Sequence, residues 1–269
     1  ACAASSSDIG TVTPFSNNAT ICSYPYPGWS GDIPGGLGLA RLDRLFADTL
    51  AGQVVDLPTA IGFCMFIRRA CLDAVGSFDA AAFGRGYGEE NDFSLRAAQL
   101  GWRNVLAADV FVYHRGSTSF RGEKAKRVQA AMALLGQRYP NYHQDIADFI
   151  ADDPLAEARR RLDWARLQQL SREKNVLIVV HGRGGGTERH VQEDVHLLTR
   201  EGYGVFLLRP LAGRPTHVAL THAATRSLPN IPPYAIADTQ ALVETLRELR
   251  VTDVHTHSLI DVVPDAPKH

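Results

Sequence analysis

The sequence predicts an α/β protein with two parts, and three observations support this prediction. Segments typical of strands alternate with segments typical of helices along the chain. A new pattern begins at Asn175, where an apolar run is followed by a glycine loop and a helix, as in a doubly wound α/β sheet. The length of 269 residues allows one large domain or two of ordinary size.

The composition fits a soluble globular protein and excludes broad electrostatic capture of nucleic acid or anionic lipid. Hydrophobic residues make up 45% of the chain and charged residues 21%, and the formal net charge is −1. The four cysteines form no C-x-x-C pair, which favours reduced thiols in a cytosolic protein. No apolar run approaches the ~20 residues that a membrane helix needs. We therefore expect a cytoplasmic protein without a nucleic-acid partner.

The first part, residues 1–144, is predicted to hold several short strands and helices, and a long loop from Ser16 to about Gly36 that is rich in Asn, Pro, Gly and Tyr. A loop of that length is usually functional or disordered. Apolar spacing predicts helices at 39–50, 91–100 and 124–139, and a short helix or turn at 68–75. Strand-like segments are 9–15, 54–58, 62–67, 104–108 and 110–114, of which 62–67 is expected to be buried.

Residues 145–174 form a charged segment with a thin apolar stripe, which predicts a helix. Two interpretations stay open: a helical linker between two domains, or a peripheral helix of the first domain. In the last part, residues 175–269, strands are predicted at 176–180, 204–208 and 251–255, and helices at 188–201 and 239–249. This alternation is typical of a doubly wound sheet.

A cluster of carboxylates stands at the start of the predicted helix at 91–100. Glu89, Glu90 and Asp92 lie within four positions. The helix dipole favours an acid at this end, which accounts for Glu89 or Asp92 alone. Three acids together repel one another unless a cation or a substrate hydroxyl is present. A carboxylate held beside other acids is also a candidate general base.

Several motifs in order resemble the family 2 glycosyltransferases, which are inverting enzymes of GT-A fold. They are Gly62-Phe-Cys-Met-Phe-Ile-Arg-Arg, Val75-Gly-Ser-Phe-Asp79, Gly88-Glu-Glu-Asn-Asp-Phe-Ser-Leu-Arg96, Gly101-Trp102 and Val112-Tyr-His114. The resemblance covers roughly residues 8 to 120. It implies that residues 1–144 are the C-terminal, acceptor half of a GT-A domain, with a mixed sheet and helices.

The resemblance also implies roles for individual residues. The family's Glu-Asp signature reads Glu89-Glu90 here, so Glu90 takes the place of the base that deprotonates the acceptor hydroxyl. Because Glu replaces Asp, Glu89 and Asp92 stay as rival bases. His114 matches a histidine that completes the family's metal site, so a divalent metal, Mn²⁺ or Mg²⁺, is expected in the full-length enzyme. The alternative for His114 is a strand-end histidine bonded to backbone.

The family's Asp-x-Asp motif, which helps to hold the donor and the metal, does not precede Ile9 in this sequence. The chain begins with Ala1 and follows no signal-peptide pattern. We therefore expect these residues to be a piece of a longer protein, and expect the 269 residues alone to be inactive.

A glycine loop opens the last part of the chain, in Val180-His-Gly-Arg-Gly-Gly-Gly-Thr-Glu-Arg-His190. Consecutive glycines allow backbone amides to approach an anion at a helix N-terminus, so Gly184, Gly185 and Gly186 are predicted to bind a phosphate or a sugar. A dinucleotide G-x-G-x-x-G pattern fits poorly, because Thr187 occupies its third glycine place.

This loop, with the later Asp253-Val-His-Thr-His-Ser, resembles the start of the family 4 glycosyltransferases, which have the GT-B fold. The resemblance implies a truncated, Rossmann-like N-terminal domain with a parallel sheet over 175–269, without the donor-binding C-terminal domain. His255 and His257 also form an H-x-H pattern, as in some metal hydrolases. Histidines at a strand end beside an acceptor cleft are the interpretation we favour.

We therefore predict a fragment of a bifunctional, bacterial-type glycosyltransferase that builds cell-surface polysaccharide. Its partners would be a nucleotide-sugar donor and a glycan acceptor, and peripheral association with the inner face of the membrane is compatible with such a role. The alternative is a non-catalytic glycan-binding or scaffolding module. A nucleotide-binding oxidoreductase would need an acid after Leu207-Leu208, where Arg209-Pro210 stands instead.

Overall fold

The computed structural model describes residues 2–33, 38–84, 87–115, 121–182, 185–225 and 228–257, with the backbone alone at 121–124. The chain divides into two compact units. The first ends at Leu162 and the second begins at Asp163. Both units combine helices with a mixed sheet, so the α/β class that the sequence predicts is confirmed.

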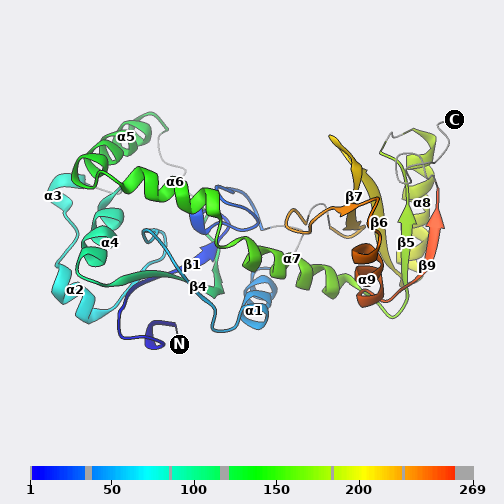
Figure 1. The fold of residues 1–269 in the computed structure, drawn as a ribbon, viewed down its shortest axis with the longest axis horizontal. Helices are drawn as coiled ribbons and strands as arrows, with labels where there is room; N and C mark the ends of the chain where they lie inside the picture. The colour runs from blue at the N-terminus through cyan, green and yellow to red at the C-terminus, as the bar shows by residue number, and fades with distance from the viewer. Residues whose placement is uncertain are drawn as a thin grey trace. The chain divides into compact units, whose positions relative to one another are not determined.

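The first unit is built on a four-stranded sheet in the order β2-β4-β1-β3. Figure 1 labels its two central strands, β1 and β4. The two central strands, β1 (Ile9–Ser16) and β4 (Arg103–Val112), run parallel. The edge strands, β2 (Val54–Asp56) and β3 (Phe66–Ile67), are antiparallel to their neighbours. Strands that are far apart in the sequence therefore meet at the centre of this unit.

The helices of the first unit include those predicted at 39–50, 68–75, 91–100 and 124–139, and a short helix at 80–83 that the sequence did not predict. They are α1 (Leu39–Thr49), α2 (Arg69–Val75), α3 (Ala80–Phe83), α4 (Glu89–Gln99), α5 (Arg121–Arg138) and α6 (Tyr142–Asp152), with 3₁₀ turns at Cys2–Ala4 and Thr20–Cys22. Helix α1 buries Leu42, Leu45 and Phe46 against the sheet. The Phe46 ring meets Phe15 at 5.4 Å and Phe111 at 5.1 Å, which joins α1 to both central strands.

Two strand predictions in the first unit are wrong in detail. The segment 62–67 was expected to be a buried strand, but only Phe66–Ile67 pairs, and Phe66 is 52% exposed. The preceding residues, 62–65, form a loop beside the start of α4. Periodicity alone does not tell such a short apolar run from a strand. The segments 104–108 and 110–114 were expected to be two strands. They belong mainly to one strand, β4, whose pairing with β1 shifts register between Pro14 and Phe15.

The charged segment at 145–174 contains most of α6 and all of α7 (Ala156–Leu170). Leu155, Ala158 and Leu162 are fully buried in the first unit, whereas Leu167 belongs to the core of the second. Helix α7 therefore contributes side chains to both units.

The second unit has a five-stranded sheet in the order β8-β7-β6-β5-β9. Strands β5 (Asn175–Val179), β6 (Gly204–Leu211) and β9 (Val251–Thr256) are parallel. One face of the sheet packs on α8 (Gly186–Arg200), and the other packs on α9 (Gln240–Glu248) and the end of α7 (Figure 1). The predicted strand–helix alternation is confirmed for these elements.

The expectation of a purely parallel sheet in this unit is wrong. Strands β7 (Arg214–His222) and β8 (Tyr234–Ala235) add an antiparallel edge. The chain turns back after β6 at Gly213, whose φ of +77° suits a tight hairpin turn. Within the described residues, no helix is both long enough and apolar enough to cross a bilayer.

Candidate functional site

The first turn of α4 brings together the three acids of the cluster. Gly88 precedes the helix with a φ of +91°, a left-handed conformation that favours glycine. A Cβ at Gly88 would also lie 2.9 Å from the Phe83 ring and 3.0 Å from Ala131. The backbone that enters α4 is therefore held closely, and the directions of the carboxylates that follow it are set by the fold.

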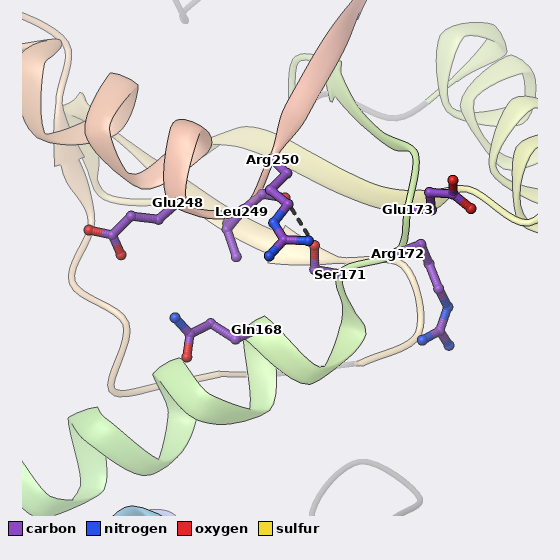
Figure 2. Close-up of a pocket in the computed structure, with 7 residues that line it drawn as sticks. All are labelled: Gln168, Ser171, Arg172, Glu173, Glu248, Leu249 and Arg250. Atoms are coloured by element: carbon purple, nitrogen blue, oxygen red, sulfur yellow. Dashed lines mark hydrogen bonds between the residues drawn. The ribbon is translucent and has the colours of Figure 1, made fainter.

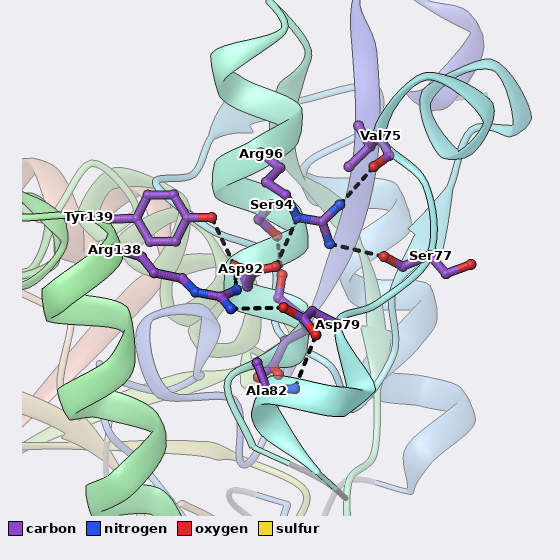
Figure 3. Close-up of polar contacts among 10 residues, drawn as sticks. Val75, Ser77, Asp79, Ala82, Asp92, Ser94, Arg96, Arg138 and Tyr139 are labelled. Atoms are coloured by element: carbon purple, nitrogen blue, oxygen red, sulfur yellow. Dashed lines mark hydrogen bonds and ion pairs between the residues drawn. The ribbon is translucent and has the colours of Figure 1, made fainter.

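Asp92 is fully buried and both of its oxygens are occupied, as Figure 3 shows. One oxygen accepts from Arg138 at 2.9 Å and from the Tyr139 hydroxyl at 2.8 Å, and the other accepts from Arg96 at 2.8 Å. Arg138 also pairs with Asp79 at 2.8 Å. This network ties the start of α4 to the end of α5 and to the loop before α3, so Asp92 has a structural role here.

Glu90 has different surroundings from Asp92. Its side chain is half-buried, and its Oε2 accepts a hydrogen bond from the Gly88 N–H at 3.1 Å. Within the described part of the chain, no ion pair involves Glu90. Burial, and then the neighbouring Glu89 carboxylate, raise the pKa of Glu90 above the ordinary value for a glutamate.

The surroundings of Glu89 differ from those of both Asp92 and Glu90. It is half-buried, and its Oε2 is buried without a hydrogen-bond partner among the described residues. A buried carboxylate oxygen without a partner costs free energy, which a proton or a bound ligand would reduce. Within the described part of the chain, neither Glu89 nor Glu90 forms an ion pair, whereas Asp92 pairs with two arginines.

His114 lies just beyond the end of β4 and is held by both backbone and side chain. Its backbone N–H donates to Asn17 Oδ1 at 2.8 Å, and its Nδ1 lies 2.7 Å from the Asn18 carbonyl oxygen. A carbonyl only accepts, so Nδ1 carries a proton and donates it to Asn18. The ring stacks on Phe63, with centroids 5.2 Å apart and planes 14° apart.

The loop at Gly62-Phe63 brings Glu90 and His114 to the same region of the first unit. A Cβ at Gly62 would lie 3.2 Å from Glu90 Cγ, and the next residue, Phe63, stacks on His114. Glu90 and His114, which are 24 positions apart in the sequence, thus contact neighbouring residues of the same loop. A carboxylate with a raised pKa can accept a proton from a hydroxyl.

The sequence pointed to Glu89, Glu90, Asp92 and His114, but it did not single out the residues that place them. Arg138 and Tyr139 hold Asp92, while Asn17 holds His114. The only signal for these partners was the presence of polar residues in a loop and at a helix end.

The family resemblance implies a divalent metal in the full-length enzyme. Among the residues that the structure describes, no group of three His, Cys, Asp or Glu side chains is placed to hold a metal ion. His114 has one feature of a metal-ligating histidine, because its Nδ1 donates to a backbone carbonyl.

In the second unit, Gly184 lies outside the described residues, whereas Gly185 and Gly186 are described. Gly185 precedes α8 with a φ of +80°, and Gly186 is its first residue. The loop follows β5, which lies between β6 and β9, so it stands at the topological switch point where open α/β sheets bind ligands.

Charged side chains near this loop are paired with one another. In the first turn of α8, Glu188 binds Arg209 through two hydrogen bonds of 2.8 and 3.0 Å. After β9, His257 Nε2 lies 2.9 Å from the Asp194 carboxylate. The H-x-H histidines are thus brought to the carboxyl end of the sheet, and His257 is bonded to an acid on α8.

A pocket of about 510 Å³ in the second unit lies at the opposite, amino ends of β5 and β9 (Figure 2). Figure 2 shows Arg172 and Glu173 on one side, and Gln168 and Glu248 on the other. Its acidic and basic side chains are balanced in number, and Ser171 already donates to the Leu249 carbonyl at 3.0 Å. Ligands in such sheets bind at the carboxyl ends of the strands, so we assign no function to this pocket.

Comparisons with known proteins add no relative. No protein-family model, no curated protein and no solved structure matches the chain.

Proposed function

We propose that the first unit is the acceptor half of an inverting, sugar-nucleotide-dependent glycosyltransferase of cell-surface polysaccharide biosynthesis. The observation that carries the proposal is the environment of Glu90. Its carboxylate is half-buried, has a raised pKa and lacks an ion-pair partner in the described part of the chain. The Gly62-Phe63 loop contacts Glu90 at Gly62 and His114 at Phe63. The ordered family motifs that contain these residues support the same proposal.

Glu90 would act as the general base. Its carboxylate takes the proton of an acceptor hydroxyl while that oxygen forms a bond to the anomeric carbon of the donor. The bond from this carbon to the nucleoside diphosphate breaks, and its electron pair leaves with the diphosphate. One displacement inverts the anomeric centre. A carboxylate whose pKa is raised toward the working pH is a stronger base, which favours this proton transfer.

The three acids of the cluster are not equally suited to this role. Asp92 would have to give up two arginine partners before it could accept a proton. Such a disruption of a buried ion pair is costly. Glu89 has no such partners but offers one oxygen that is already buried. We therefore assign the base to Glu90 and a supporting electrostatic effect to Glu89, whose charge raises the pKa of Glu90.

The metal expected from the family resemblance would neutralise the leaving diphosphate. In this chain, His114 would offer one ligand through Nε2, and the Asn18 carbonyl fixes its ring. In the second unit, the amides at the start of α8 would bind a phosphate or a sugar, with Gly185 and Gly186 allowing a close approach.

The alternative function is a glycan-binding module without transfer activity. The sequence favours it in one respect, because none of the 269 residues forms an Asp-x-Asp motif. Both functions require that the first unit bind a glycan, so binding alone does not distinguish them. Turnover does.

The test uses the natural protein that carries these residues. Release of nucleoside diphosphate from UDP-, GDP- and dTDP-sugars is measured with and without saccharide acceptors. Acceptor-dependent release from at least one donor supports the proposal. Saccharide binding without release from any donor would support the glycan-binding module and contradict the transferase.

A further inference from the structure

The loop that follows β1 is aromatic and almost uncharged. Residues 16–33 include Tyr24, Tyr26 and Trp29, and their one charged side chain is Asp32. No lysine or arginine occurs in this stretch. The rest is mainly Ser, Asn, Pro and Gly, so aromatic rings stand among small polar residues.

This loop is held in one conformation by many bonds. Ser23 Oγ accepts from the Ala19 N–H at 2.9 Å and donates to the Trp29 carbonyl at 3.0 Å. The Gly28 N–H donates to the Thr20 carbonyl at 2.8 Å. Below the loop, the buried Arg159 donates to the Ser23 carbonyl at 3.0 Å. A loop fixed in advance loses little conformational entropy when a ligand binds.

Two tyrosines are exposed on and beside the loop. Tyr26 is 43% exposed, and its ring meets Trp29 edge-to-face at 5.1 Å. Tyr113, next to His114, is 37% exposed and its hydroxyl lies 3.4 Å from Asp32 Oδ1. Trp29 covers Gly31, where a Cβ would lie only 2.6 Å from the indole. Tyr26, Trp29, Asp32 and Tyr113 form what we call the aromatic platform.

The platform is connected to the candidate catalytic residues. The side chain of Asn17 donates to the Gly31 carbonyl at 2.6 Å and accepts from the His114 N–H at 2.8 Å. The loop is thus bonded to the strand end that carries His114. His114 stacks on Phe63, and the preceding Gly62 contacts Glu90. A continuous series of contacts leads from the platform to the proposed base.

We propose that the aromatic platform binds the pyranose rings of an uncharged saccharide. A pyranose has an apolar C–H face, which packs on an aromatic ring, and hydroxyl groups at its edge, which need hydrogen-bond acceptors. Tyr26 and Tyr113 supply rings that are apolar on their faces and polar at one end. Asp32 supplies a carboxylate beside the Tyr113 hydroxyl, and a carboxylate is a strong acceptor for hydroxyl groups.

Other occupants fit less well. A nucleic acid also stacks on aromatic rings, but its phosphates need lysine or arginine, which residues 16–33 lack. A stable protein interface buries about 800 Å² on each partner around an apolar centre. The exposed apolar groups of the loop are a few rings among serine, asparagine and glycine. A small neutral ligand with many hydroxyl groups matches this pattern best.

This inference depends on the proposed function only for the identity of the saccharide, which would be the acceptor near Glu90. The natural protein is mixed in turn with maltohexaose, cellohexaose and chitohexaose, and saturation-transfer NMR is recorded with irradiation of the aromatic protons. Stacking is tolerant of ring substituents, so we expect transfer to the C–H protons of at least one hexasaccharide. Affinity is then measured by calorimetry for wild type, Tyr26→Ala and Tyr113→Ala.

We expect each tyrosine variant to bind about fivefold more weakly than wild type. Phe66→Ala removes a 52% exposed ring on β3, outside the platform, and should bind like wild type. Thermal melting of every variant checks that a loss of affinity does not come from unfolding. Absence of transfer to all three sugars up to their solubility limits overturns the platform, and so does equal affinity in the Tyr26→Ala/Tyr113→Ala double variant. Turnover without saccharide binding at the platform would contradict the platform and not the transferase. Saccharide binding at the platform without turnover would contradict the transferase and not the platform.

Discussion

The side chain of Glu90 packs directly against the backbone of Gly62. A Cβ added at Gly62 would lie 3.2 Å from Glu90 Cγ, 3.3 Å from its Cδ and 3.5 Å from its Cβ. The first two contacts are tighter than ordinary van der Waals contact, so the glycine favours the present position of the carboxylate. Gly62 therefore helps to set the place of the group that we assign as the base, although it carries no functional side chain.

Gly62→Ala should displace the Glu90 carboxylate and reduce turnover of the natural protein by about tenfold or more, since small misplacement of a catalytic group is costly. The variant should still fold, because Gly62 does not have a positive φ. Gly38→Ala is a matched control, with no atom near the added Cβ and a φ of −69°. Steady-state kinetics and thermal melting of both variants check this. Equal activity of Gly62→Ala and wild type would show that Glu90 need not stay where it lies.

Asp92→Asn should mainly reduce stability. The change removes the charge that faces Arg96 and Arg138 in a buried position, and breaking such a pair costs about 3 kcal/mol. Asp56→Asn is the control, because its pair with Arg103 is exposed and such pairs contribute less than about 1 kcal/mol. Urea unfolding measures both free energies. If Asp92→Asn proved as stable as wild type but inactive, Asp92 and not Glu90 would be the base.

The raised pKa of Glu90 predicts a pH-dependent effect on stability. The folded protein holds this proton more tightly than the unfolded chain, so the contribution of Glu90 to the free energy of unfolding falls as the pH rises from the ordinary glutamate pKa through the raised one. Glu90→Gln removes the buried charge. The variant should be more stable than wild type at neutral pH, and the difference should vanish near about pH 4. Urea titrations across this range test it, and a variant less stable than wild type at neutral pH would contradict a destabilising carboxylate.

His114→Ala should raise the Mn²⁺ concentration that gives half-maximal activity in the natural protein. The change removes the Nε2 lone pair, whereas the lost bond to Asn18 should lower stability by only about 1 kcal/mol. Mn²⁺ titration and thermal melting of the same variant separate the two roles of the ring. A clearly destabilised variant with an unchanged Mn²⁺ requirement would make His114 a structural residue only.

Much of the fold follows from local patterns in the sequence. The apolar spacing of Leu42, Leu45 and Phe46 predicts α1, and Gly101 correctly marks the end of α4 with its φ of +85°. The strands β5 and β6 follow from apolar runs, and β9 follows from its place after a helix in the strand–helix alternation. These elements are predictable because periodicity and end signals are properties of neighbouring residues.

The remaining features depend on contacts between distant residues. The antiparallel strand β7 was missed because its alternation is interrupted by polar residues and its pairing partner β6 decides its structure. In the site, Asp92 and Glu90 look alike in the sequence. Arg138, which is 46 positions beyond Asp92, pairs with Asp92 and not with Glu90. Such a difference in environment cannot be predicted from a cluster of acids alone.

The most direct test of Glu90 as the base is the turnover number of Glu90→Gln in the natural protein, measured as acceptor-dependent release of nucleoside diphosphate. Glutamine keeps the size of the side chain and can still accept from the Gly88 N–H, but it cannot take a proton. The account predicts a fall of about 10²–10⁴-fold, the usual contribution of a general base, with unchanged affinity for the nucleotide sugar. Turnover within a factor of about two of wild type would contradict it.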